Sequence, residues 1–86
     1  MKITYESVSG DYLMRSVGTA GHQIIKINKD HLFIKQIEGN PEAKKAIEFF
    51  AQAYFKAREG VNLHDNKFED FNNLLALKLK SIVRNQ

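Results

Sequence analysis

The stretch HQIIKINKDHLFIK, residues 22–35, decides the fold predicted for this chain of 86 residues. β-Branched and aromatic residues alternate with polar ones on both sides of Lys29-Asp30, a pair that suits a tight turn. We therefore predict an antiparallel hairpin of two strands, residues 22–28 and 31–37. Its apolar residues do not all fall on one face, so one face is predicted to be core and the other is mixed.

The residues before this stretch extend the hairpin into a meander. Residues 2–8 and 11–17 also alternate with period two, Ser9-Gly10 suits a two-residue turn, and GTAG at 18–21 suits a short loop. These turns place the cross-strand partners on one face, which we predict to be the core face. Its members are Ile3, Tyr5, Tyr12, Met14, Ile25, Ile27, Leu32 and Ile34.

The pattern changes to helical spacing at Pro41, the only proline. Asn40 suits an N-cap, Pro41 suits the first helical position, and Gly60 suits the residue just beyond a helix end. These signals predict a helix over residues 41–59. A second helix is predicted over residues 66–84, with an apolar stripe at spacings of three and four. The stripe consists of Phe68, Phe71, Leu75, Leu79 and Ile82, widened by Leu74 and Val83.

Together these elements predict a single α+β domain, residues 1–86. A four-stranded antiparallel meander, about residues 2–37, is followed by two helices packed on one sheet face, in the order ββββαα. No apolar run approaches about 18 residues, so we expect no membrane span. The first ten residues lack the apolar segment of a signal peptide, and the chain has no cysteine, so a reducing cytoplasm is the expected compartment.

Residues for catalysis or metal binding do not form a recognisable pattern. The three histidines, His22, His31 and His64, lack the spacing that brings metal ligands together. No glycine-rich loop joins a strand to a helix, and no serine has a base nearby in the sequence. We therefore predict that the protein is not an enzyme and has no metal, cofactor or small-molecule substrate.

The mixed face of the predicted sheet is the candidate binding surface. Two helices cover only one side of a four-stranded sheet, so the other side is expected to be open, and open apolar patches tend to belong to interfaces. We place Phe33 near its centre, with lysines and an arginine around it. The predicted partner-binding residues are Leu13, Arg15, Val17, Ile24, Lys26, Phe33, Lys35 and Ile37.

These features favour a small non-catalytic binding protein that docks on a macromolecular partner: another protein, a second copy, or both. Small, cysteine-free domains of this kind are common among inhibitors and regulators carried by phages and mobile elements, which act on host protein complexes. The alternative is a nucleic-acid-binding module in which Phe33 stacks on a base while Arg15, Lys26 and Lys35 reach phosphates. The net charge of +3 is compatible with both functions. Phe49 and Phe55 lie off the main helical stripe, so one of them is expected to be exposed.

Overall fold

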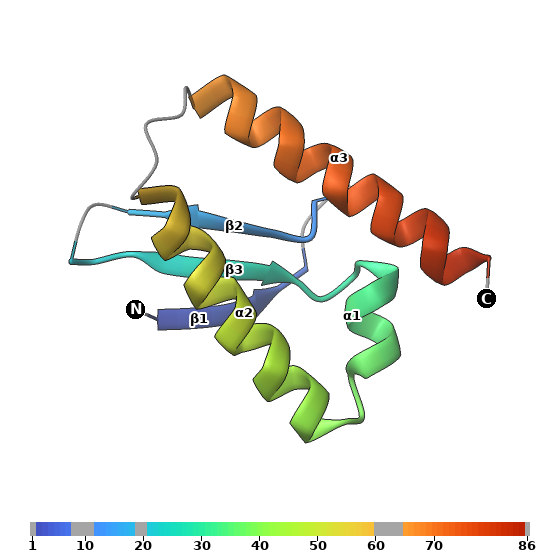
Figure 1. Ribbon diagram of the computed structural model, residues 1–86. Coiled ribbons are helices and arrows are strands. Elements are labelled where there is room, and N and C mark those ends of the chain that lie inside the picture. The colour runs from blue at the N-terminus through green and yellow to red at the C-terminus, as the bar shows by residue number, and fades with distance from the viewer. Residues whose placement is uncertain (1, 8–11, 19–20, 60–64, 86) are drawn as a thin grey trace.

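The computed structural model describes residues 2–7, 12–18, 21–59 and 65–85 of the chain. Within them the fold is α+β, with a mixed three-stranded sheet and three helices (Figure 1). The elements are β1 (Lys2–Glu6), β2 (Met14–Val17), β3 (Ile24–Asn28), α1 (Leu32–Ile37), α2 (Pro41–Glu59) and α3 (Asp65–Arg84). Helix α2 crosses one face of the sheet, while α3 runs beyond the β2 edge.

The sheet has the strand order β1-β3-β2, so β3 is central. Strand β1 pairs with β3 in parallel, with Ile3 opposite Ile25, and β2 pairs with β3 antiparallel, with Ser16 opposite Ile25. The predicted four-stranded antiparallel meander is therefore wrong. Period-two alternation is the same in parallel and antiparallel strands, so it identifies the faces of a strand but not its neighbours.

The register between β2 and β3 also differs from the predicted one. Met14 lies opposite Ile27, two residues from the predicted partner Ile25. A shift of two residues keeps every side chain on its face, so the predicted face assignment of Ile3, Tyr5, Met14, Ile25 and Ile27 holds in the sheet. The predicted turn at Ser9-Gly10 lies outside the described residues.

The connection between β2 and β3 depends on glycine. Gly18 and Gly21, the ends of the predicted GTAG loop, have φ angles of +105° and +89°, a region that other residues rarely adopt. A Cβ atom on Gly18 would also lie 2.5 Å from the carbonyl oxygen of His22. Gly18 is therefore required both by its backbone conformation and by the close approach of the returning chain.

Residues 31–37, predicted to be the fourth strand, form the end of a turn and the short helix α1. The side chain of Asn28 accepts a hydrogen bond from the Asp30 amide at 3.0 Å, which turns the chain after β3. The extended His31 then caps α1, because its Nδ1 accepts a hydrogen bond from the Phe33 amide at 3.0 Å. A short apolar run fits a strand or a helix equally well, and here the two side-chain bonds select the helix.

The core lies between the sheet and the helices. Its buried members are Leu13, Met14, Ile25, Ile27, Ile34, Ala51, Phe55 and Ala76. Asn40 caps α2 as predicted: its Oδ1 accepts a hydrogen bond from the Ala43 amide at 3.1 Å, and the helix begins at Pro41. Phe55 is buried against the sheet while Phe49 is exposed, so one of the two is exposed as expected. No helix in the described part of the chain is both long and apolar enough to cross a membrane.

Candidate partner-binding surfaces

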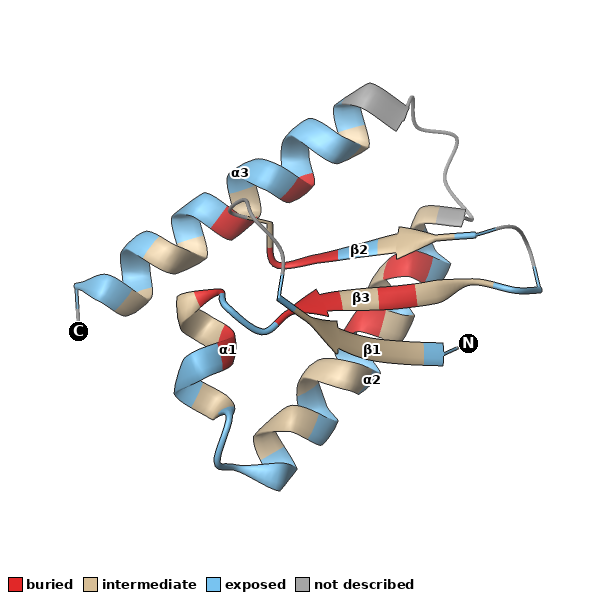
Figure 2. Cartoon of the chain, turned by 180° about the vertical axis from the view of Figure 1, so that it is seen from behind, coloured by how far each residue is buried: buried red, intermediate tan, exposed pale blue. Residues whose placement is uncertain are grey.

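Helix α2 covers one face of the sheet, and the other face is uncovered. Figure 2 shows this open face toward the viewer, with none of the described helices in front of it. Four of the predicted binding residues lie on it in two opposed pairs, Arg15 with Lys26 and Val17 with Ile24. The structure therefore brings these four together on adjacent strands.

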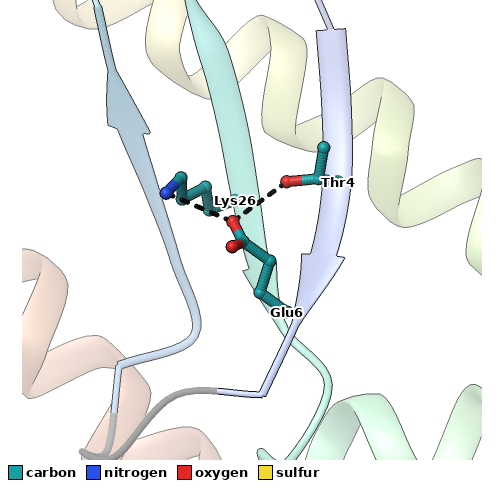
Figure 3. A network of polar contacts seen from close by, with 3 residues as sticks. All are labelled: Thr4, Glu6 and Lys26. Carbon is teal, nitrogen blue, oxygen red and sulfur yellow. Dashed lines mark hydrogen bonds and ion pairs between the residues drawn. The ribbon is translucent and has the colours of Figure 1, made fainter.

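The open face is more polar than the sequence suggested. Glu6 is the centre of a small network: its Oε2 accepts a hydrogen bond from Thr4 Oγ1 at 3.2 Å and lies 3.3 Å from Lys26 Nζ (Figure 3). Val17 and Ile24 are the apolar members that the three strands contribute, and both are half-buried. The apolar area is thus smaller than predicted.

The other four predicted binding residues lie elsewhere. Leu13 is buried in the core, just before β2. Phe33, Lys35 and Ile37 belong to α1 instead of a fourth strand, and Phe33 and Ile37 pack against the core while Lys35 is exposed. The three strands place no aromatic side chain on the open face, so the predicted stacking platform for a nucleic-acid base is not formed there.

Helix α3 presents a different apolar surface, which is not among the predicted binding residues. Four large side chains on it are about half exposed, and we call them the α3 ridge. They are Phe71 (57%), Leu74 (53%), Leu77 (47%) and Ile82 (58%). Phe71 and Ile82 belong to the stripe predicted to face the core, and Leu74 to its margin, so part of that stripe faces solvent, while Phe68 and Leu79 of the same stripe pack against the core.

Hydrogen bonds to buried polar groups hold α3 in this rotation. Asn72 Nδ2 donates to the carbonyl oxygen of Met14 at 2.8 Å, and Asn72 Oδ1 accepts from the Tyr54 hydroxyl at 3.4 Å. On the next turn, Nε2 of the buried His31 lies 2.9 Å from the carbonyl oxygen of Ala76. Since His31 Nδ1 accepts a hydrogen bond from the Phe33 amide, Nε2 carries the ring proton and donates a hydrogen bond to the carbonyl oxygen of Ala76.

This arrangement has a sequence signal that is visible in retrospect. Ala76 is the only alanine of α3, and it follows Asn72 by one helical turn. A small residue lets the helix backbone approach the sheet and α1, and a buried asparagine satisfies a strand carbonyl that lacks a neighbouring strand. Asn72 and Ala76 therefore mark the side of α3 that is buried.

The outer side of α2 is a third exposed surface. Phe49 is 61% exposed and Phe50 is 54% exposed. The inner side is fixed, because the Tyr5 hydroxyl donates a hydrogen bond to Glu48 Oε2 at 2.6 Å and Lys44 Nζ lies 4.5 Å from the centre of the Tyr5 ring. Burial, followed by the hydrogen bond to Glu48, raises the pKa of Tyr5 well above its ordinary value. Helix α2 is therefore anchored on one side and open on the other.

An open pocket of about 520 Å³ lies between β2, the end of α2 and the start of α3. Two arginines line it, and each rests on an aromatic ring: Arg15 lies 4.7 Å from the centre of the Tyr12 ring and Arg58 lies 4.8 Å from that of Phe68. Glu69 also lines the pocket, so its charge is mixed. Among the described residues, the lining does not include the histidine or paired carboxylates that acid–base catalysis would use.

Metal ligands are not assembled in the described part of the chain, where no three His, Cys, Asp or Glu side chains gather. His22 is exposed, both ring nitrogens of His31 are used in hydrogen bonds, and His64 lies outside the described residues. Comparisons with protein-family models, with curated proteins and with solved structures found no match. No relative therefore assigns a role to these surfaces.

Proposed function

We propose that the protein is a non-catalytic docking module whose α3 ridge binds a protein partner. The observation that carries this proposal is the exposure of four large apolar side chains on one helix of a small chain. Apolar surface in water is unfavourable by about 25 cal/mol per Å², and contiguous patches of this kind are usually covered by a partner. The open sheet face, with its Glu6–Lys26 ion pair, offers less apolar area.

The charges beside the α3 ridge indicate the chemistry of the partner. Lys67 precedes Phe71 by four residues and Lys78 follows Leu74 by four, so both lysines lie on the ridge side of the helix. Both are exposed, and they are about 16 Å apart along the axis. A complementary surface is an apolar groove with one carboxylate beyond its Phe71 end and another beside Leu77. The positive net charge of the chain would speed its encounter with such an acidic partner.

Site-specific photocrosslinking in cells of the source organism tests this proposal. A benzophenone amino acid at position 71 is expected to give a discrete adduct with another protein, because Phe71 lies in the ridge. The same group at Glu69, which is exposed but lies one helical turn before the buried Asn72 and beside no ridge residue, is the matched control and should not give that adduct. Lys78→Glu should lower the yield at position 71 several-fold by repelling an acidic partner.

Three results would contradict the proposal. The first is an identical set of protein adducts from positions 71 and 69, which would show that the partner does not prefer the ridge. The second is an adduct at position 71 that nuclease digestion removes, because it would identify a nucleic-acid partner. The third is a position-71 adduct that contains only a second copy of this chain.

A further inference from the structure

The outer side of α2 carries a heptad pattern separate from the residues that α2 buries. Ala43, Ala46, Phe50, Ala53 and Ala57, which we call the α2 seam, follow one another at intervals of three, four, three and four. That spacing is the repeat of a helix that packs along another helix. The residues that face the core are different ones, including Ala51, Tyr54 and Phe55.

The α2 seam is open in the structure. Its last four members are exposed, and Ala43 is half-buried. In Figure 1, α2 lies in front of the sheet and none of the other described elements covers its outer side. Because four of the five seam residues are alanine, a second helix is able to approach closely, near the short end of the usual 8–10 Å between helix axes.

We propose that the α2 seam pairs with the α2 seam of a second copy, antiparallel, to form a two-fold symmetric dimer. The charges along one edge of the seam select this occupant and this direction. Glu42, Phe49 and Lys56 recur every seven residues on that edge, and all three are exposed. In an antiparallel pair the corresponding edges face each other, so Glu42 meets Lys56 of the partner subunit and Lys56 meets the partner's Glu42.

The centre of this arrangement is also self-complementary. With Glu42 opposite Lys56 of the partner subunit, the two-fold axis passes beside Phe49, and the two Phe49 rings meet there. A parallel pair would instead set this edge of one helix against the opposite edge of the other, so Glu42 and Lys56 would not meet. The antiparallel direction also brings opposite ends of the two helix dipoles together.

The α3 ridge is a poorer surface for a second copy. An antiparallel α3 pair would bring Lys78 of both copies into the apolar strip near the centre of the helices, where a buried charge needs a partner. The dimer therefore uses α2 and leaves α3 free for a different protein. This inference uses another helix and does not depend on the proposed docking function.

Sedimentation of purified protein over a range of concentrations tests the dimer, with charge reversals as the probe. Wild type is expected to associate to a dimer. Glu42→Lys alone and Lys56→Glu alone should each weaken association about tenfold, because each turns two attractive exposed pairs into repulsive ones. The double variant, Glu42→Lys with Lys56→Glu, should restore association, because the opposite charges then face each other again.

Two further variants make the result decisive. Ala53→Glu places a charge on the exposed seam without changing the core, so it should abolish the dimer while circular dichroism stays unchanged. Asp70→Lys reverses a charge on α3 and is expected to have no effect on association.

A wild type that remains monomeric at all concentrations would overturn the proposed dimer, as would a double variant that associates as weakly as the single ones. Either failure leaves the crosslinking result expected at position 71 intact, so the two proposals are tested separately.

Discussion

Replacing Ile25 by Ala is expected to lower the free energy of unfolding by about 2–5 kcal/mol, because it removes three carbon atoms from a fully buried site and leaves a cavity. Ile25 is in the central strand, opposite Ile3 on one side and Ser16 on the other, so the strands on both sides hinder collapse around the cavity. Urea denaturation measures the effect as a shift of the unfolding midpoint.

The adjacent residue provides the matched control. Ile24 has the same side chain in the same strand, but it lies on the open face and is only half-buried. Ile24→Ala should therefore cost clearly less than Ile25→Ala. If Ile24→Ala is the more costly change, the face assigned to the core is the wrong one.

The second large effect is expected at His31, which links α1 to α3. His31→Leu introduces an apolar side chain of similar size, and it removes both the cap on the Phe33 amide and the hydrogen bond to the Ala76 carbonyl. A lost cap costs about 1 kcal/mol and a lost buried hydrogen bond about 1–3 kcal/mol, so we expect a loss of about 2–4 kcal/mol in unfolding free energy.

His31→Asn separates the two contributions. Asparagine is a good N-cap, so it keeps the bond to the Phe33 amide, but its shorter side chain does not reach Ala76. Its stability should fall between those of wild type and His31→Leu. If His31→Asn is as stable as wild type, the bond to Ala76 contributes nothing and α3 is held in place by other contacts.

The faces of the strands were predictable from the sequence because alternation alone determines them. Ile25 and Ile27 are buried, and Lys26 is on the open face, although the strand order and the register both differ from the predicted ones. The two long helices were predictable for a similar reason. The Asn40 cap and Pro41 act locally, so they specify the start of α2 without information about what it packs against.

The predictions that proved wrong concern features that depend on interactions between residues far apart in the chain. The parallel pairing of β1 with β3 leaves no signal in the period-two pattern. Within residues 22–35, His31 is predicted to be a strand residue, whereas its ring caps α1 and reaches Ala76 of α3, 45 residues further along the chain. With residues 31–37 removed from the sheet, Phe33 and its neighbours no longer belong to the predicted binding face.

The α3 ridge was missed for a related physical reason. Hydrophobic periodicity predicts that the most apolar side of a helix is buried, and in α3 that side includes Phe71 and Ile82. The structure instead centres the buried side on Asn72 and Ala76, so Phe68 and Leu79 of the stripe pack against the core while Phe71 and Ile82 are exposed. A helix that exposes four large apolar side chains in this way is suited to a partner.

Thiol labelling of α3 tests this orientation most directly, since the chain has no cysteine and every introduced one is unique. Leu74→Cys and Ala76→Cys lie two residues apart on the same helix, but Leu74 is 53% exposed and Ala76 is fully buried. The structure predicts that Cys at position 74 of the folded protein reacts with a maleimide at a rate close to that in urea, while Cys at position 76 is strongly protected until the protein unfolds. Protection at position 74 together with fast labelling at position 76 would show that α3 buries its Leu74 side, and it would contradict both the exposed ridge and the docking function proposed for it.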